Sequence, residues 1–143
     1  MNLNRLLSLR EYVDLTQEEM SRVLGVNRVN ISNWENGKEI IPLEKLNIYA
    51  NYFNVSIDYI LGISDLKNES VKKINLDKKL IGQNLLKFRK KFGLTQDELA
   101  QELNTTHSTI SAYETGKTLI LTSFLYQIAI SYNVSIDELV GRL

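Results

Sequence analysis

The sequence contains no cysteine, a single proline, a single histidine and no long apolar run. Without cysteine it can form no disulfide, thiolate metal site or thiol nucleophile, which suits a reducing cytosolic setting. His107 has no local carboxylate cluster that would complete a zinc site, so we expect no metal and no cofactor. Apolar stretches fall short of the about 18 residues that span a bilayer, and charges follow the N-terminus too early for a signal peptide. We therefore expect a soluble, cytoplasmic protein with no membrane contact.

An excess of positive charge is also missing, because 17 lysines and arginines balance 17 aspartates and glutamates. The balance is uneven along the chain: six basic and nine acidic residues at 1–65, five and two at 66–79, and six and six at 80–143. These counts give net charges of −3, +3 and 0. If the protein binds DNA, this distribution predicts modest non-specific affinity and greater dependence on base contacts. No nucleophile elbow, P-loop or dinucleotide fingerprint is present, so we do not expect an enzyme.

The chain contains an internal repeat with an offset of 79 residues and no gap. Positions 2–64 and 81–143 share 22 identities in 63, including LTQ-x-E at Leu15 and Leu94, and NVSID at Asn54 and Asn133. Such self-similarity indicates two copies of one structural unit. We predict an N-terminal domain over 1–62, a basic connector over 63–79 and a C-terminal domain over 80–143. The connector can be flexible, or helical through Val71 and Ile74.

Apolar residues recur three and four positions apart, which is typical of amphipathic helices, and no segment alternates long enough to form a strand. We predict an all-α fold with five helices per copy, at 3–13, 17–24, 28–36, 42–53 and 57–61, and again 79 residues later. Thr16 and Thr95 fit the capping box with a glutamate three residues on. The pairs Asp14/Gly93 and Gly25/Asn104 exchange residue types that readily adopt left-handed backbone, so each predicts a tight turn.

The second and third helices with their short turn have the pattern of a helix-turn-helix. LTQEEMSRVLGVNRVNISNWENGKEIIP, starting at Leu15, and LTQDELAQELNTTHSTISAYETGKTL, starting at Leu94, resemble the Cro/CI (XRE) family of phage and bacterial repressors. The two copies cover nearly the whole chain. The resemblance implies two tandem five-helix, lambda-repressor-like domains that insert the third helix into the major groove of an operator.

The third helix should present base-reading side chains on the face opposite Ile31 and Trp34. Arginine can pair bidentately with guanine, asparagine can pair with adenine, and smaller groups can contact the thymine methyl. The predicted base contacts are Arg28, Val29 and Asn33 in the first copy and His107, Ser108 and Ala112 in the second. The smaller side chains of the second copy predict a weaker or more permissive base code.

Polar residues around the two helices are expected to contact phosphate or brace those that do. The N-terminus of the second helix favours an anion, and the family's matching glutamine braces the recognition helix. The predicted residues are Gln17, Asn27, Asn36, Lys38, Gln96, Thr106 and Lys117. Asn27 and Thr106 can also act as caps of the third helix, and we favour capping for both.

Four charged residues have a structural interpretation that we favour over DNA contact. The family often pairs the residues equivalent to Arg10 and Glu35 inside the domain, and Arg89 and Glu114 occupy the same positions in the second copy. Trp34 and Tyr113 are one equivalent position at helical spacing from a buried isoleucine, so we predict core packing rather than base stacking for them.

Together these features predict a sequence-specific transcriptional regulator, most simply a repressor, that binds double-stranded DNA with one or both domains. About 13 flexible connector residues would span about 20 Å on average and about 43 Å at most, and half-sites lie about 34–36 Å apart. The alternative is an antitoxin or antirepressor in which one domain serves a homodimer or a regulatory protein partner.

Overall fold

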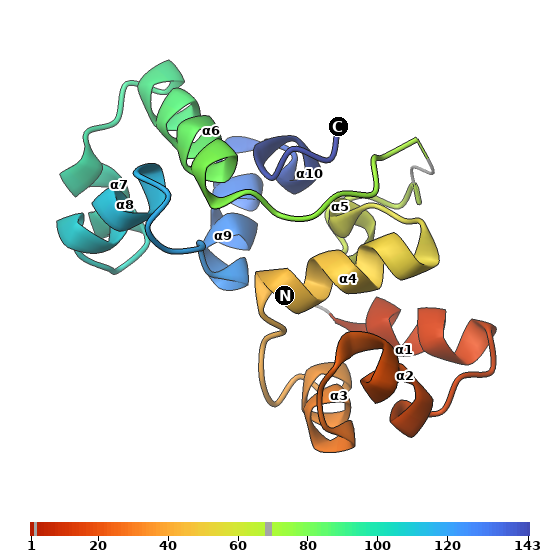
Figure 1. Cartoon of the computed structure of the whole chain (residues 1–143). Coiled ribbons are helices and arrows are strands. Elements are labelled where there is room, and N and C mark those ends of the chain that lie inside the picture. The colour runs from red at the N-terminus through yellow and green to blue at the C-terminus, as the bar shows by residue number, and fades with distance from the viewer. Residues whose placement is uncertain (2, 68–69) are drawn as a thin grey trace. The chain divides into compact units, whose positions relative to one another are not determined.

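The computed structural model describes residues 1, 3–67 and 70–143 of the chain. These residues form ten α-helices and no strand (Figure 1). Contacts within the backbone divide the chain into Met1–Lys73, which we call unit 1, and Ile74–Leu143, which we call unit 2. The prediction of an all-α chain with two copies of a helical domain is therefore confirmed. The predicted domain limits at 62/63 and 79/80 stay predictions.

Each unit contains five helices in the same order. Unit 1 comprises α1 (Asn4–Tyr12), α2 (Gln17–Leu24), α3 (Arg28–Glu35), α4 (Leu43–Phe53) and α5 (Ile57–Ile60). Unit 2 comprises α6 (Lys78–Lys91), α7 (Gln96–Glu102), α8 (His107–Glu114), α9 (Thr122–Tyr132) and α10 (Ile136–Leu139). The helix ends lie within one residue of the predictions except at α6, which begins four residues before the predicted position 82. Asp77 explains the early start, because its carboxylate accepts hydrogen bonds from the Lys79 and Leu80 amides.

Each core is built from apolar residues at matching positions of the two copies. Members of both cores that are at most 8% exposed are Leu6, Leu9, Met20, Leu24, Ile31 and Leu46, and Leu85, Phe88, Leu99, Leu103, Ile110 and Leu125. Trp34 is 5% exposed and Tyr113 is 7% exposed, so both pack in the core as predicted. Their burial fixes the opposite face of α3 and of α8 toward the surface.

The turns around the helix-turn-helix have the predicted backbone. Asp14, Gly25, Gly93 and Asn104 all adopt left-handed φ values between 55° and 68°. Thr16 and Thr95 form the predicted capping boxes with Glu19 and Glu98. In each unit, one turn ends the first helix before the capping threonine starts the second, and another turn ends the second helix. These turns fix the positions of α3 and α8 relative to the helices before them.

The two predicted caps of the third helix differ in outcome. Thr106 caps α8, because its hydroxyl accepts a hydrogen bond from the Thr109 amide at 3.2 Å. Asn27 occupies the N-cap position of α3 with extended backbone, but its side chain accepts no capping hydrogen bond. The capping prediction for Asn27 is therefore wrong, and the first turn of α3 lacks the side-chain acceptor that α8 has.

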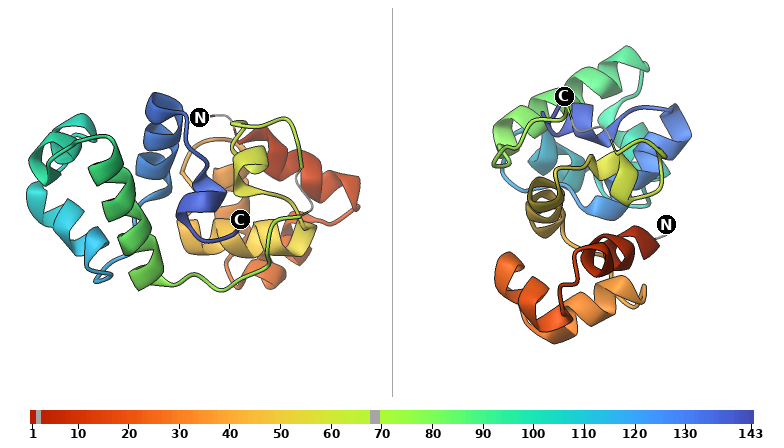
Figure 2. Two further views of the ribbon diagram at one scale, coloured as in Figure 1. Left: turned by 90° about the horizontal axis from the view of Figure 1, so that it is seen from above. Right: turned by 90° about the vertical axis from the view of Figure 1, so that its right-hand side faces the viewer.

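Helix α6 approaches α8 closely in unit 2 (Figure 2). A Cβ atom added to Gly82 would lie 2.4 Å from the Tyr113 carbonyl oxygen and 2.7 Å from that of Glu114. The equivalent position in unit 1 is Leu3, which precedes α1 and is buried. Because glycine has no Cβ, the N-terminal half of α6, which is longer than that of α1, packs directly on the backbone at the end of α8.

The segment after α5 folds back on unit 1 instead of continuing as a helix. The Ser56 amide donates to the Lys67 carbonyl at 2.8 Å, and the Arg5 guanidinium donates to the Ser64 carbonyl at 2.5 Å. Arg5 also pairs with Asp65 at 2.6 Å. Residues 63–67 and 70–77 contain no helix, so the helical alternative for the connector is wrong for these residues, and Val71 and Ile74 lie outside any helix.

Candidate nucleic-acid interface

The outer face of α3 carries the three predicted base contacts of unit 1. Arg28 and Val29 are exposed and Asn33 is half-buried, whereas Ile31 and Trp34 are buried in the core. The helix is eight residues long, so it offers about two turns of side chains to a groove. Burial of one face and exposure of the other are the arrangement that a groove-reading helix requires.

A chain of hydrogen bonds connects the interior of unit 1 to Arg28. The Arg10 guanidinium donates to both oxygens of Glu35, from Nε at 2.6 Å and from Nη2 at 2.9 Å. Gln17 Nε2 donates to Glu35 Oε1 at 3.0 Å, and Arg28 Nη1 donates to Gln17 Oε1 at 3.2 Å. Gln17 therefore links the buried ion pair to an exposed arginine at the start of α3. This is the bracing role that the family resemblance implies.

The ion pair is almost sealed from water. The side chains of Arg10 and Glu35 are 11% and 5% exposed, and Arg10 also donates to the Leu15 carbonyl at 2.8 Å. The hydrogen bond with Glu35 raises the pKa of Arg10 against the opposing effect of burial, so Arg10 stays charged. Arg10 is fully engaged inside the domain, as predicted, and it fixes the carboxylate that holds Gln17.

Unit 2 contains the equivalent ion pair and glutamine, but the hydrogen-bond chain does not continue from the glutamine to the first residue of the third helix. Arg89 donates to Glu114 at 2.7 and 2.9 Å, and Gln96 donates to Glu114 at 2.9 Å. His107, which replaces Arg28, instead contacts Asp97 on α7, with 2.8 Å between Nδ1 and Oδ1. Asp97 was not among the predicted site residues. Its signal in the sequence is an acid ten positions before the sole histidine, at the start of the helix that precedes it.

The other predicted groups of unit 2 lie along the exposed side of α8. Ser108 is exposed, Ala112 is half-buried, and Tyr113 turns inward. Thr106, at the N-cap of α8, is also within 3.0 Å of the Thr109 hydroxyl. The face of α8 therefore presents small side chains beside a histidine that a carboxylate already engages, in contrast to the arginine and asparagine of α3.

The loop after the third helix presents one lysine in each unit. The Lys38 amide donates to Asn36 Oδ1 at 2.9 Å, which fixes the turn that follows α3. The Lys117 amide donates to the Ala112 carbonyl at 2.9 Å in the matching turn. Both lysines are exposed, and neither forms a salt bridge with any described residue. A lysine at this position can therefore meet a phosphate beside the recognition helix.

Residues 1, 3–67 and 70–143 contain no group of three or more histidines, cysteines or acids arranged to hold a metal ion. None of the described helices is long and apolar enough to cross a membrane.

Each five-helix unit exposes the outer face of the recognition helix of a helix-turn-helix, α3 in unit 1 and α8 in unit 2. This arrangement defines a protein of the DNA-binding regulator class. Residues 6–60 and residues 85–139 each match a helix-turn-helix family, which is the Cro/CI (XRE) type that the sequence resembles. The chain belongs to this family and carries two copies of its domain.

Three relatives extend the comparison. An HTH-type transcriptional regulator of Bacillus subtilis strain 168, YobD, is 36% identical over 76 residues, which cover 53% of this chain and 68% of that protein. Antitoxin PezA of Streptococcus pneumoniae is 39% identical over 61 residues, or 43% of this chain and 39% of PezA. The HTH-type transcriptional activator BcrR of Enterococcus faecalis is 39% identical over 62 residues, or 43% of this chain and 30% of BcrR. No solved structure matches the chain significantly.

Proposed function

We propose that the chain is a transcriptional repressor that recognises a specific operator mainly through α3 of unit 1. The observation that carries the proposal is the bond chain from Arg10 through Glu35 and Gln17 to Arg28. A side chain held in this way loses less rotational freedom when it binds a base, so more of its hydrogen-bond energy contributes to affinity. Repression then follows from occupancy of promoter DNA.

In the proposed complex, the base code of unit 1 comes from three side chains. Arg28 donates two N–H groups from one edge of its guanidinium to guanine O6 and N7, and Asn33 pairs with adenine N6 and N7. Val29, which is 55% exposed, supplies an apolar contact for a thymine methyl. Each bidentate pair contributes about 1–3 kcal/mol of discrimination against the wrong base.

Phosphate contacts would fix the position of α3 without reading sequence. Lys38 and the amide of Asn36 lie at the end of the helix, and Gln17 and Asn27 lie at the start of α2 and α3. Because Asn27 accepts no capping bond, its side chain is available for a phosphate. Exposed Glu18 and Glu19 in the first turn of α2 oppose the phosphate backbone, which fits a domain that gains its affinity from specific contacts.

Unit 2 is proposed to make a weaker contact of the same kind. Gln96, Thr106 and Lys117 occupy the positions of the residues that we propose contact phosphate in unit 1. His107, Ser108 and Ala112 would face the bases. Asp97 holds His107 and adds negative charge close to where a phosphate would bind. Unit 2 should therefore tolerate more sequences than unit 1.

A binding-site selection from random DNA, followed by gel shift with the enriched sequence, tests the proposal. Arg28→Ala should relax preference at one base pair, whereas Lys38→Ala should weaken every sequence equally and lower the slope of log affinity against log salt by about 0.9. Glu39→Ala, a change of the exposed neighbour, is the matched control for Lys38→Ala and should not lower that slope. Failure to enrich any sequence would refute the proposal.

A second candidate function is an antitoxin-like module that acts through a protein partner. It is favoured by the similarity of a 61-residue stretch to a protein named an antitoxin, and by the zero net charge. Co-purification with a single stoichiometric partner would support it, together with DNA affinity unchanged by Arg28→Ala and Asn33→Ala. Loss of specific DNA binding in those two variants would favour the repressor.

A further inference from the structure

The turn that follows the recognition helix of unit 2 lies against the first turn of α6. A Cβ atom added to Gly116, in the turn after α8, would lie 2.9 Å from Lys79 Cα and 2.9 Å from Lys79 Cγ. Real Cβ atoms almost never come this close to another backbone, so the contact requires glycine. The side chain of Lys79 therefore leaves α6 directly beside the turn that carries Lys117.

Further contacts hold the first turn of α6 in place. Gly82 lies against the carbonyl groups at the end of α8, as described above. A Cβ atom added to Gly141, just after α10, would lie 2.9 Å from Leu80 Cδ2. Asp77 caps the helix by accepting hydrogen bonds from the amides of Lys79 and Leu80. The start of α6 is thus fixed between the ends of α8 and α10, which sets the position of Lys79 relative to the recognition helix.

Lys78, Lys79 and Lys117, which we call the lysine cluster, place three ammonium groups in this region. Lys78 and Lys79 precede Gly82 by four and three positions, which is the spacing of residues on one face of a helix. This face is directed toward the end of α8, because Gly82 touches the backbone there. All three lysines are exposed, and none forms a salt bridge with a residue that the structure describes.

The acids next to the lysine cluster in the sequence are already engaged by other groups. The Asp77 carboxylate accepts from two backbone amides of α6. Glu114, the last residue of α8, accepts from Arg89 and Gln96 inside the domain. Since Asp77 satisfies those α6 amides, an anion at this place would be bound by the ammonium groups and not by the helix end. Three lysines and Asp77 leave a net charge of +2.

We propose that Lys78 and Lys79 extend the phosphate-binding surface of unit 2 beyond Lys117, so that the lysine cluster binds the DNA backbone beside the recognition helix. This inference rests on the proposed function of unit 2 as a DNA-binding domain. Lysine binds phosphate as a point charge, and contacts with the DNA backbone position a recognition helix without reading sequence. The added charge offsets the carboxylate of Asp97 and the small base-reading side chains of α8.

A DNA backbone suits the lysine cluster better than an acidic protein surface does. Lysine is depleted at protein interfaces, whereas contacts with DNA phosphates come largely from lysine and arginine. The cluster also adjoins the end of α8, whose outer face is proposed to meet the bases, so one duplex would reach both. An acidic protein partner would leave the salt dependence of DNA binding unaffected by changes in the cluster, which the experiment below measures.

Binding of the full chain to DNA over a range of salt concentrations, followed by fluorescence anisotropy, tests the proposal. Lys79→Gln keeps a long side chain that favours helix and removes the charge. On the sequence enriched by selection and on an unrelated duplex, it should lower the slope of log affinity against log salt by about 0.9, and Lys78→Gln combined with Lys79→Gln should lower it by about 1.8. From about 50 to about 200 mM salt, the affinity of Lys79→Gln should fall about 3.5-fold less than that of the original chain. Lys79→Arg keeps the charge and should keep the original slope.

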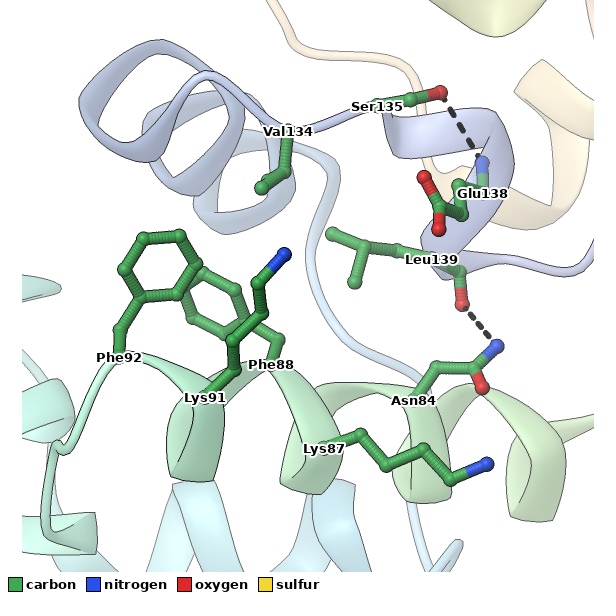
Figure 3. A pocket seen from close by; sticks show the side chains of 9 residues that line it. All are labelled: Asn84, Lys87, Phe88, Lys91, Phe92, Val134, Ser135, Glu138 and Leu139. Carbon is green, nitrogen blue, oxygen red and sulfur yellow. Dashed lines mark hydrogen bonds between the residues drawn. The ribbon is translucent and has the colours of Figure 1, made fainter.

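The matched control is Lys87→Gln, which removes the same charge from the same helix. Lys87 lines the groove between α6 and α10 instead of facing α8, so its loss should leave the slope unchanged (Figure 3). An unchanged slope for Lys79→Gln, or equal decreases for Lys79→Gln and Lys87→Gln, would overturn the proposal even if the chain still selects one sequence.

The unrelated duplex separates this inference from the proposed function. If no sequence is enriched but Lys79→Gln still lowers the slope on the unrelated duplex, specific operator recognition would be refuted and the phosphate contact supported. Circular dichroism of each variant reports whether it is folded. Because Lys79→Arg and Lys79→Gln both keep the Cγ atom beside Gly116, a loss of slope in the glutamine variant alone would assign the effect to charge.

Discussion

Removing the charge of Glu35 should disrupt unit 1 more than any other single polar change near the interface. Glu35→Gln keeps the size of the side chain but takes the counter-ion from Arg10, whose side chain is 11% exposed. Three hydrogen bonds of 2.6–3.0 Å converge on the carboxylate. An amide nitrogen in place of one oxygen would face donors from Arg10 or Gln17.

The expected loss lies between two reference cases. Exposed ion pairs contribute about 0–1 kcal/mol, and breaking a fully buried pair costs about 3–5 kcal/mol. Arg10 keeps some contact with water and its bond to the Leu15 carbonyl. We therefore expect Glu35→Gln to lower the free energy of unfolding of unit 1 by about 2–3 kcal/mol, intermediate between those two cases.

Trp34 makes the assay specific to one unit, because it is the sole tryptophan and lies in the core of unit 1. In urea, tryptophan fluorescence should report unfolding of unit 1, while circular dichroism reports both units. Glu35→Gln should shift the fluorescence midpoint down by about 2–3 M if the urea slope is about 1 kcal/mol per M. Glu114→Gln, the matched change in unit 2, should leave that midpoint in place. A shift below about 1 M for Glu35→Gln would refute the reasoning, since the ion pair would then contribute no more than a surface pair.

Two further predictions concern stability. Gly82→Ala puts a Cβ against the backbone of α8 and should lower the free energy of unfolding of unit 2 by about 1–3 kcal/mol. Circular dichroism should show this loss while the Trp34 fluorescence transition stays unchanged. Gln83→Ala, at an exposed position, is the control, and equal stability of the two variants would contradict the close contact. Burial raises the pKa of Tyr49, whose hydroxyl donates to the Leu6 carbonyl. The contribution of neutral Tyr49 to stability is therefore complete below its pKa in the unfolded chain, about 10, and is lost as the pH rises through its higher pKa in the folded state. Unit 1 should therefore lose stability above about pH 10, and Tyr49→Phe should flatten that loss; an unchanged pH profile would exclude Tyr49 as its cause.

Much of the fold was predictable because local rules decide it. Helical spacing, capping boxes at Thr16 and Thr95, and left-handed turns at Asp14 and Asn104 act over a few residues, and two copies supply the same signal twice. The ion pairs were predictable only through the family resemblance, since charge alone also suits a phosphate contact.

The errors and omissions come from contacts between distant residues. Asn27 has the residue type of a cap, but nothing local determines whether its side chain turns toward the helix or the solvent. Asp77 caps the early start of α6, but the longer helix also requires Gly82 to accommodate the backbone of α8. Asp137 and Arg142 form a fully buried ion pair at 3.0 Å that no pattern in the sequence suggested, because its burial is set by the packing of unit 2 as a whole.

The packed segment after α5 was missed for a related reason. Three of the five residues 63–67 are polar, and the segment belongs to the connector predicted from the sequence. Their attachment depends on Arg5, which lies about 60 positions earlier and bonds to Tyr59, Ser64 and Asp65. Only the structure shows that this segment is attached to α1 and α5 of unit 1.

The measurement that tests the central claim most directly is binding-site selection from random DNA with the original chain and with Arg28→Ala in parallel. The account predicts one enriched sequence for the original chain and loss of preference at a single base pair for the variant. Enrichment of the same sequence with the same preferences by both proteins would contradict it, because α3 would then not be the element that reads the operator.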